Sequence, residues 1–377
     1  MNFDKITEYL NSVVEMGVPS VDCIIMEDHK QVFRYMTGFT DHAKTKKVEA
    51  DQLYLMFSMT KVQTMTAVMQ LVEQGKISLE DEIGNYLPAY KNIMVKSADG
   101  EVKPAATSLK LKHLVSMQSG LDYDLSRPGI LRVLKEKGAK AGTQELVNSF
   151  VESPLKFNPG THFEYSLSHD VVAAVIEVVS GMSFGEYLKK NIWEPVGMNS
   201  TYFAKPMNYD KNLAEQYEYD GEKNLIKPME PSCCYQLSES YESGGAGLIS
   251  CTEDYAKLGD TLANGGVAAN GNRILKAETI EIIRTNLLEG DSLDEIVKNM
   301  GRLGYGYGCG MQILMKPELI GSPAPAGIFG WDGAAGSCVI MCPEQKKALA
   351  FSMHVRGYGP AYGVIHPMLR DLVFGEE

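Results

Sequence analysis

Apolar residues recur at helical spacing over residues 58–75, which form the strongest periodic segment of the chain. Valine, methionine and leucine stand three and four positions apart there, and Gly75 supplies a stop signal after the last of them. This pattern predicts a buried helix that begins at Ser58. Further helices are expected over residues 3–16, 171–179, 252–265, 276–288 and 361–374.

Strand patterns gather near the two ends of the sequence. Residues 20–26 and 31–36 are rich in apolar and β-branched side chains around a polar turn, which predicts a hairpin. Later strands are expected over residues 304–315, 327–331, 337–342 and 347–354. Short turns join the later strands, so antiparallel pairing is the simplest topology.

The segment between these two regions carries mostly helical patterns. The sequence therefore predicts an α+β fold, in which an antiparallel sheet is flanked by helices and interrupted by an inserted all-α domain. Residues 1–80 together with residues 241–377 are expected to form the sheet domain. Residues 81–240 are expected to form the mostly helical insertion, which carries Tyr165.

The composition is that of an ordinary globular protein. The chain has 377 residues, of which 44% are hydrophobic and 22% are charged, with a formal net charge of −12. An acidic protein lacks the dominant basic surface that nucleic acids and anionic membranes attract, so neither is expected as a partner. No signal-peptide pattern and no apolar run of membrane-spanning length is visible, and we expect a cytoplasmic protein.

Seven cysteines are dispersed along the chain, an odd number that fits reduced thiols rather than a disulfide framework. Cys338 and Cys342 lie in one apolar strand pattern, where alternation places both on the same face. No companion ligands stand near them at metal-binding spacing, so buried core thiols are expected. The sequence predicts no metal and no cofactor.

Ser58 and Lys61 stand three positions apart at the start of the predicted helix. Such positions share one helix face, so the hydroxyl and the amine can point into the same space. A neutral, desolvated lysine can accept the proton of a serine nucleophile. A serine at a helix start can also be a simple N-cap, and the spacing leaves both interpretations open. A second match, Ser153 with Lys156, runs into a turn cluster and is set aside.

Two more segments can supply what such a site still needs, a second proton carrier and donors for an oxyanion. Tyr165 stands in a turn that precedes the helix expected over residues 171–179. Residues 330–336 are rich in glycine and lie at a strand entry, where a backbone can approach a ligand closely. Each segment alone has an ordinary structural explanation, but the order of the three is informative.

In this order the segments resemble the serine β-lactamase and penicillin-binding-protein superfamily, especially the class C β-lactamases, the D-alanyl-D-alanine carboxypeptidases and the related esterases. The resemblance spans nearly the whole chain, and the supporting stretches are residues 79–88, 111–121, 157–160, 243–250 and 254–255. It implies that Ser58 is the acylated nucleophile, Lys61 its base and Tyr165 the proton shuttle. It also implies an oxyanion hole made of the backbone N–H groups of Ser58 and Ala334.

Substrate contacts are expected from Trp331, Asp332, Gly333 and Leu167, and three of these residues mark departures from the family pattern. Leu167 replaces the asparagine of the Tyr-x-Asn motif, and Trp331 replaces the lysine or histidine that meets a substrate carboxylate. Asp332 adds a negative charge that should oppose such a carboxylate. These changes weaken the β-lactam and peptide interpretations and favour small acyl esters.

The resemblance therefore implies a serine hydrolase that acts through an acyl-enzyme on a small-molecule acyl substrate, most simply an ester. A β-lactamase or carboxypeptidase-like amidase and a sensor that is acylated without turnover are the alternatives. Whether Lys61 or Tyr165 is the primary base is left open. The further candidates for the pocket wall are Tyr123, Tyr305 and Tyr307.

Two other motifs have better structural explanations. Gly181-Met-Ser183-Phe-Gly185 matches the nucleophile elbow of α/β-hydrolases, but a helix rather than a strand precedes it. Ser183 with Glu186 instead predicts a capping box for the next helix. The pair His169 and Asp170 is adjacent in sequence and is expected to form a helix start rather than part of a triad.

Overall fold

A computed structural model describes residues 1–97, 99–205 and 209–375 of the chain. The helices are α1 (Phe3–Glu15), α2 (Thr60–Glu73), α3 (Leu111–Val115), α4 (Pro128–Lys137), α5 (Thr143–Ser149), α6 (Ser168–Ser180), α7 (Phe184–Leu188), α8 (Glu194–Val196), α9 (Thr252–Ala263), α10 (Ala277–Ile283), α11 (Asp291–Met300) and α12 (His366–Phe374). The strands are β1 (Ser20–Glu27), β2 (Lys30–Gly38), β3 (Leu53–Leu55), β4 (Met94–Lys96), β5 (Val102–Pro104), β6 (Tyr202–Phe203), β7 (Gln216–Asp220), β8 (Leu225–Met229), β9 (Leu248–Cys251), β10 (Tyr305–Tyr307), β11 (Gln312–Leu314), β12 (Phe329–Asp332), β13 (Cys338–Cys342), β14 (Lys347–Ser352) and β15 (Val355–Arg356).

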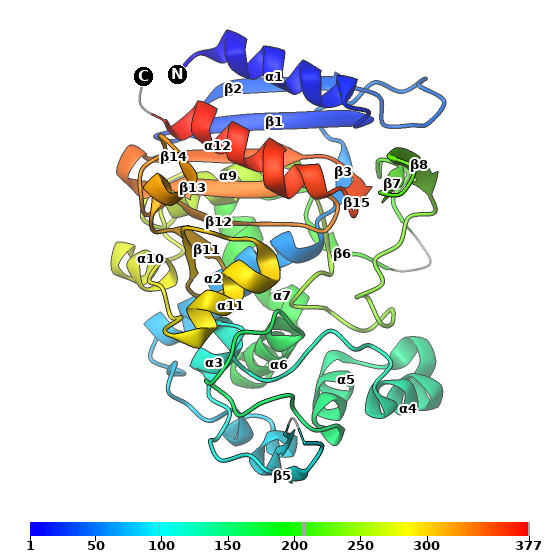
Figure 1. Ribbon diagram of the computed structural model, residues 1–377, viewed down its shortest axis with the longest axis vertical. Helices are drawn as coiled ribbons and strands as arrows, with labels where there is room; N and C mark the ends of the chain where they lie inside the picture. The colour runs from blue at the N-terminus through cyan, green and yellow to red at the C-terminus, as the bar shows by residue number, and fades with distance from the viewer. Residues whose placement is uncertain (98, 206–208, 376–377) are drawn as a thin grey trace.

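The two ends of the chain build one sheet. Among the described residues the largest sheet has seven strands in the order β10-β11-β12-β13-β14-β1-β2, and every neighbouring pair is antiparallel. The register between β1 and β14 pairs Asp22 with Ser352. Figure 1 shows this sheet at one end of the molecule and the helices α3 to α6 at the other. The predicted α+β fold with an antiparallel sheet flanked by helices is confirmed.

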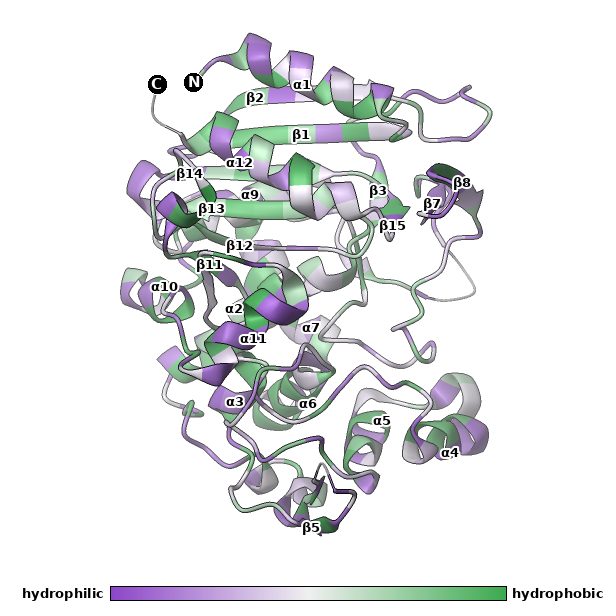
Figure 2. Ribbon diagram, in the orientation of Figure 1, coloured by the Kyte–Doolittle hydropathy of each residue, from purple (hydrophilic) through white to green (hydrophobic). Residues whose placement is uncertain are grey.

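Helices cover both faces of this sheet, and the side chains that alternate along each strand pack against them. Cys23 and Ile25 of β1 belong to a core shared with α1 and α12, whereas Ile24 and Met26 belong to a second core shared with α9 and α2. Figure 1 shows α1 and α12 crossing the front of the sheet, with α9 behind it. Because both faces are buried, β1 and β13 are apolar along most of their length (Figure 2).

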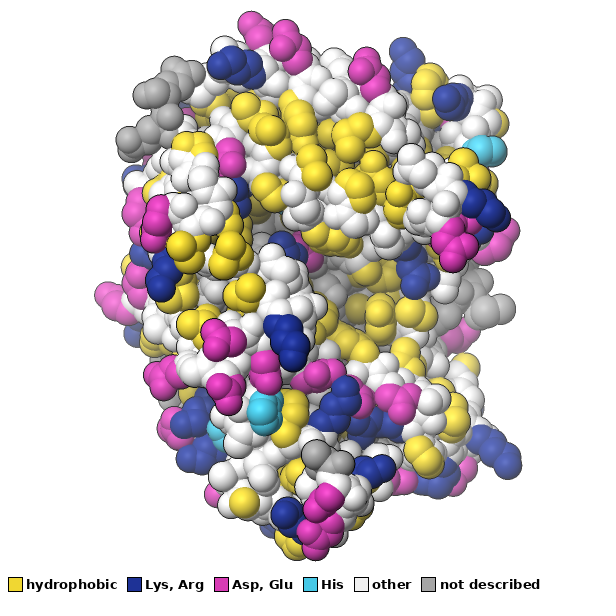
Figure 3. Space-filling model, in the orientation of Figure 1, with side chains coloured by type: hydrophobic (Ala, Val, Ile, Leu, Met, Phe, Trp, Pro, Cys, Tyr) yellow, Lys and Arg dark blue, Asp and Glu magenta, His cyan; other side chains and the backbone are white. Residues whose placement is uncertain are grey.

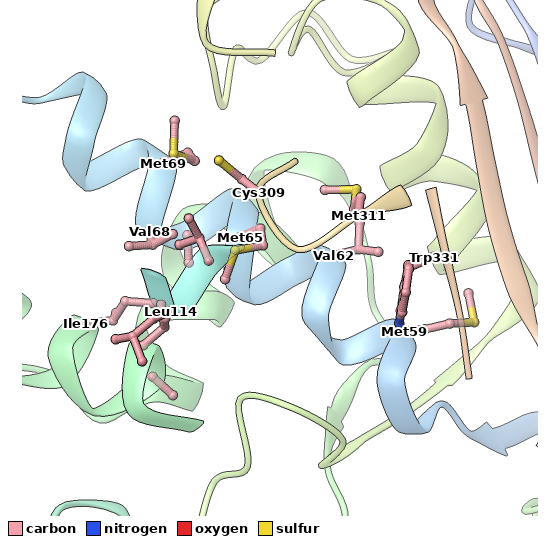
Figure 4. Close-up of a cluster of buried hydrophobic side chains, with 14 of the residues drawn as sticks. Met59, Val62, Met65, Val68, Met69, Leu114, Ile176, Cys309, Met311 and Trp331 are labelled. Atoms are coloured by element: carbon pink, nitrogen blue, oxygen red, sulfur yellow. The ribbon is translucent and has the colours of Figure 1, made fainter. Parts of the chain in front are cut away.

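Helix α2 is buried on nearly every side. Figure 4 shows Met65 and Val68 of α2 beside Leu114 of α3 and Ile176 of α6, while Met59, just before α2, lies against Trp331 of β12. The packing therefore fixes the start of α2 between the helical part of the molecule and strand β12 of the sheet. Truncating a large apolar side chain in such a core costs about 2–5 kcal/mol.

The region between β10 and β11 differs from the prediction. One strand was expected over residues 304–315, but a tight turn at Gly308 and Gly310 divides it into two. A Cβ atom at Gly308 would lie 2.3 Å from the carbonyl oxygen of Ile283, so this turn packs directly against the end of α10. The helix expected over residues 276–288 accordingly ends at Ile283. Helix α11 was not predicted, although its apolar residues stand at helical spacing, Leu293, Ile296, Val297 and Met300.

The segment predicted as a helical insertion also holds the short strands β4 to β8. Strand β6 pairs with β9, and β7 pairs in parallel with β15. One apolar core joins residues from this segment to residues of α2 and β12. The predicted division of the chain into a sheet domain and an insertion of residues 81–240 stays a prediction.

Helix α6 is the most apolar of the chain, and most of its side chains lie in the core. No single helix among the described ranges is long and apolar enough to span a membrane. Segments Ser168–Ser180 and Phe184–Val196 reach that length and hydropathy only together, across a bend of 75°.

All seven cysteines are free thiols, and Cys234 is the exposed one. Cys338 and Cys342 are buried in the core that lies under α1 and α12. The prediction that both face the same side of their strand is confirmed.

Candidate active site

Ser58 lies in a tight turn between β3 and α2. The turn spans Phe57–Met59, and the helix proper begins at Thr60, two residues later than predicted. Phe57 has a φ of +46°, a left-handed conformation that is strained for a bulky residue and that tends to be kept at functional sites. No side chain caps this turn or the start of α2, so the interpretation of Ser58 as an N-cap is wrong. The Ser58 side chain is instead partly exposed to a cavity.

Lys61 lies directly beneath Ser58 and is fully buried. Its Nζ atom donates hydrogen bonds to Ser58 Oγ at 3.1 Å, to the Tyr123 hydroxyl at 2.9 Å and to the Gly245 carbonyl at 2.7 Å. Burial lowers the pKa of Lys61 to about 7, although the carboxyl groups of Asp170 and Asp332 oppose this shift. A substantial fraction of Lys61 is therefore neutral near pH 7.

Asp170 supports this lysine from the start of α6. Its Oδ1 atom accepts hydrogen bonds from Tyr241 and Ser243, both at 2.7 Å, while its buried Oδ2 atom has no partner among the described residues. A Cβ atom at position 245 would lie 2.8 Å from that Oδ2 and 3.5 Å from Lys61 Nζ. Glycine at position 245 therefore lets the backbone carbonyl reach the lysine.

Tyr165 approaches the same site from the loop before α6. Trp331 Nε1 donates a hydrogen bond of 3.0 Å to the Tyr165 hydroxyl, and Lys61 Nζ lies 4.7 Å from the centre of the tyrosine ring. Burial raises the pKa of Tyr165 well above its ordinary value, so the phenol keeps its proton. Tyr307 packs edge-on against Trp331, with ring centres 5.2 Å apart, and holds the indole in place.

The end of β12 meets the Ser58 turn closely enough to leave two backbone donors free. A Cβ atom at Gly333 would lie 2.3 Å from the carbonyl oxygen of Met56, so only glycine permits this contact. Within the described part of the chain, the backbone N–H groups of Ser58 and Ala334 have no protein acceptor. Both residues line the same cavity, where a substrate oxygen can accept from these N–H groups.

The cavity has a volume of about 350 Å³. Its lining residues are Ser58, Tyr123, Tyr165, Tyr235, Asn299, Met300, Arg302, Trp331, Asp332, Ala334 and Tyr362. Figure 3 shows the molecule hollowed on this face, below α12 and above the helical part, with hydrophobic side chains around the hollow. Five of these eleven residues are aromatic.

Most of the predicted site residues come together here. Ser58, Tyr165, Trp331, Asp332 and Ala334 line the cavity, and Lys61 lies just below it. Two predicted substrate contacts do not reach the cavity wall. Gly333 is covered by the Ser58 turn, and Leu167 is 2% exposed with its side chain in the core, because the backbone enters α6 at this point.

The three tyrosines that were further candidates for the pocket wall, Tyr123, Tyr305 and Tyr307, lie in different places. Tyr123 lines the cavity and contacts Lys61, whereas Tyr307 lies behind Trp331. The Tyr305 hydroxyl accepts a hydrogen bond from Arg370 of α12, so Tyr305 faces the core on the opposite side of the sheet. The prediction of a pocket wall holds for Tyr123 alone among the three.

Sequence reasoning missed Arg302, which forms an ion pair with Asp332 inside the cavity. Asp332 was expected to oppose a substrate carboxylate, and this stays a prediction; the structure adds that the Arg302 guanidinium pairs with the Asp332 carboxylate. Arg302 follows α11 in a short glycine-rich connection, where no periodic pattern or motif marks it. Tyr235 and Tyr362, also cavity residues, were missed because no motif marks them, although Tyr362 lies in the helix expected over residues 361–374.

The remaining motifs are structural, as expected. Ser183 Oγ accepts a hydrogen bond from the Glu186 N–H at 3.2 Å, and the Glu186 carboxylate accepts from the Ser183 N–H at 3.0 Å, which completes the predicted capping box. His169 and Asp170 lie within the first turn of α6, and burial keeps the pKa of His169 well below its ordinary value. Lys156 pairs with Glu164 at 2.7 Å, away from the cavity.

A seven-stranded antiparallel sheet covered by helices, with a serine, a lysine and a tyrosine meeting near its edge, defines the β-lactamase and transpeptidase-like class of proteins. A family model described as Beta-lactamase matches residues 4–371, so the chain belongs to this family. The family includes hydrolases and acyltransferases, and its esterase and penicillin-binding-like members are represented among the similar proteins below.

Similar proteins cover nearly the whole chain. Esterase EstB from Burkholderia gladioli is 25% identical over 380 residues, which cover 93% of this chain and 89% of that protein. A putative D-alanyl-D-alanine carboxypeptidase from Escherichia coli K12 is 24% identical over 356 residues, with coverage of 88% and 77%. The solved structure of EstCE1, a hydrolase with promiscuous acyltransferase activity, has a TM-score of 0.81 at 22% identity and covers 99% of this chain and 98% of that chain.

Proposed function

We propose that this protein is a serine hydrolase that forms an acyl-enzyme on Ser58 and acts on small acyl esters. The observation that carries the proposal is the 3.1 Å contact between Ser58 Oγ and Lys61 Nζ, in which the lysine has a pKa of about 7. A buried amine that is partly neutral at pH 7 can accept the serine proton during attack. This is the chemistry that a hydrolase of this family needs.

In the acylation step, the oxygen of Ser58 attacks the ester carbonyl while its proton moves to neutral Lys61. The tetrahedral oxyanion accepts hydrogen bonds from the backbone N–H groups of Ser58 and Ala334, which are already in place before the reaction. Removing one donor of such a pair typically costs about 3–4 kcal/mol of barrier. The ester C–O bond then breaks, and the leaving oxygen takes a proton.

Tyr165 is the proton donor that suits the leaving group. Its hydroxyl accepts from Trp331, so its own hydrogen is free to point toward Ser58 and the substrate. The raised pKa keeps Tyr165 protonated in the resting site, so no phenolate is available to accept the serine proton, which favours Lys61 as the primary base. The proton held by Lys61 then replaces the one that Tyr165 has given up.

Deacylation reverses these roles. A water molecule takes the place of the leaving group, loses a proton to the lysine and tyrosine pair, and attacks the acyl carbonyl within the same oxyanion hole. The bond to Ser58 Oγ breaks, and the serine recovers its proton. An alcohol in place of water would give acyl transfer, the promiscuous activity that is described for EstCE1.

The cavity wall supports esters over amides. Trp331 stands where related amidases carry a cation or a histidine, and Leu167 is buried instead of offering an amide group. The similarity to esterase EstB agrees with this preference. Amide hydrolysis is the second candidate, because a carboxypeptidase is among the relatives and the serine and lysine pair is common to both chemistries.

Intact-mass analysis with a fluorophosphonate and with a penicillin tests the proposal. The wild-type chain should gain one fluorophosphonate adduct, and Ser58→Ala should gain none. Ser153→Ala is the matched control, because Ser153 also precedes a lysine by three positions and should label like the wild type. Labelling that survives Ser58→Ala would refute the assignment. A chromogenic ester then distinguishes a hydrolase from a sensor that is acylated without turnover. A burst followed by steady turnover indicates a hydrolase, and a burst alone indicates a sensor.

A further inference from the structure

Arg302 and Asp332 form an ion pair inside the cavity that holds Ser58. The Arg302 Nη2 atom donates to Asp332 Oδ2, and the two side chains are only 12% and 11% exposed. Both residues line the cavity, and neither is needed for the acylation chemistry described above. The pair therefore stands at one end of the binding site with its charges almost removed from water.

The pair is not saturated by the protein. Arg302 Nε is buried and has no hydrogen-bond partner among the described residues, and the one acceptor that the structure gives the guanidinium is Asp332. His366 Nδ1 lies 4.0 Å from Asp332 Oδ2, and burial lowers the pKa of this histidine, so it adds no positive charge at neutral pH. The single aspartate therefore balances the single arginine.

This balance determines which substrates fit. A carboxylate entering this end of the cavity would meet a cation already paired and a like charge directly beside it, so it would lose its hydration without gaining a partner. An uncharged group would lose much less. The aromatic side chains of Tyr235 and Tyr362, which also line the cavity, favour the same kind of group.

We propose, on the basis of the ester hydrolase function argued above, that Asp332 is a specificity residue. It neutralises Arg302 and thereby restricts the cavity to esters that are uncharged at this end. Replacing Asp332 by an uncharged residue exposes the arginine and creates a binding site for a substrate carboxylate.

The test compares three esters with the full-length chain. The first is 4-nitrophenyl butyrate, which is neutral. The second is mono-4-nitrophenyl glutarate, with a carboxylate in the acyl chain, and the third is 3-carboxyphenyl butyrate, with a carboxylate on the leaving group. Asp332→Asn should raise kcat/KM for one carboxylate ester relative to the neutral ester by about tenfold or more, the effect of one charge-assisted hydrogen bond. A ratio that stays within about twofold of the wild type for both esters overturns the proposal.

Two further variants keep the test decisive if Asp332→Asn folds poorly. Arg302→Gln leaves the aspartate unpaired and should lower the same ratio while favouring the 4-nitrophenyl ester of 6-aminohexanoate, which carries an ammonium group. The double variant, Arg302→Gln with Asp332→Asn, is again neutral and should return the ratio toward the wild-type value. A double variant that keeps the preference of either single variant would contradict the proposal.

Fluorophosphonate labelling of Ser58 measures the concentration of active sites in each variant. A partly unfolded sample is recognised in this way, and its rate constants are corrected for the unfolded fraction. A wild-type chain that does not hydrolyse 4-nitrophenyl butyrate with a Ser58-dependent rate would refute the proposed function. Hydrolysis of this ester in all variants without any change in the ratios would refute the role of Asp332 alone.

Discussion

The indole Nε1 of Trp331 donates a hydrogen bond of 3.0 Å to the hydroxyl oxygen of Tyr165. Trp331 comes from β12 of the sheet and Tyr165 from the loop before α6, so this bond joins the two parts of the site. It also sets the direction of the phenol hydrogen, because an oxygen that accepts from the indole offers its own hydrogen elsewhere. In the proposed mechanism, Trp331 is therefore a positioning residue as well as a wall of the cavity.

Replacing Trp331 by Phe should lower kcat by about 3- to 10-fold, the worth of one hydrogen bond, with a smaller change in KM. Steady-state kinetics on a neutral ester measures both constants. Tyr307→Phe is the matched control, because the buried Tyr307 hydroxyl has no partner among the described residues and its removal should leave kcat unchanged. Equal effects of the two substitutions would show that only the packing of the indole matters.

The activity should depend on pH through Lys61. In the proposed mechanism the neutral amine is the base, and its pKa is lowered to about 7, so kcat/KM should rise about tenfold per pH unit below pH 7 and level off above it. Because burial raises the pKa of Tyr165, no descending limb is expected at moderately alkaline pH. Lys61→Ala should reduce kcat by about 10²- to 10⁴-fold and remove this limb. A flat profile in the wild type would contradict the role of the lysine.

Asp170→Asn should shift the rise of kcat/KM with pH to lower pH. The Asp170 carboxylate raises the pKa of Lys61, so its removal lets burial lower that pKa further. The measurement is the midpoint of the kcat/KM profile. Asp254→Asn serves as the control, because Asp254 is also a buried carboxylate that accepts several hydrogen bonds but makes no contact with Lys61. A midpoint that moves equally in both variants would indicate a general loss of structure.

Gly333→Ala should destabilise the protein by about 1–3 kcal/mol and lower kcat, because the added Cβ would lie 2.3 Å from the Met56 carbonyl oxygen. The strain should push β12 away from the Ser58 turn and displace the Ala334 N–H. Thermal unfolding and ester hydrolysis measure the two effects. Gly359→Ala meets open space and should change neither. Full activity with a lowered Tm would argue against Ala334 as an oxyanion donor.

The part of the site that is local in sequence could be predicted, and the part that depends on distant contacts could not. Ser58 and Lys61 share one short segment, so their spacing indicated that the hydroxyl and the amine could meet, although it left a simple N-cap open, and the two atoms lie 3.1 Å apart. The ion pair of Arg302 with Asp332 joins two different elements, and no pattern along the chain encodes it. The resemblance to a family supplied Tyr165 and Ala334 but not this arginine, because it concerns motifs and not the residues between them.

The same distinction applies to the fold. The periodic segments of α1, α2 and α9 and the hairpin of β1 and β2 appear where they were expected. The start of α2 was placed two residues too early, because the strained turn at Phe57 is held by its surroundings and not by a local signal. The division of residues 304–315 into two strands likewise follows from the contact with α10.

Strand β1 has two neighbours in the sheet, β2 beside it in sequence and β14 near the opposite end of the chain. During synthesis the segment that carries Ser58 leaves the ribosome long before β14 exists, and until then one edge of β1 is an unpaired template for aggregation. Pairings of such long sequence separation also form slowly. The candidate site is thus completed in a late, cooperative step, and fragments shortened before residue 352 should be insoluble.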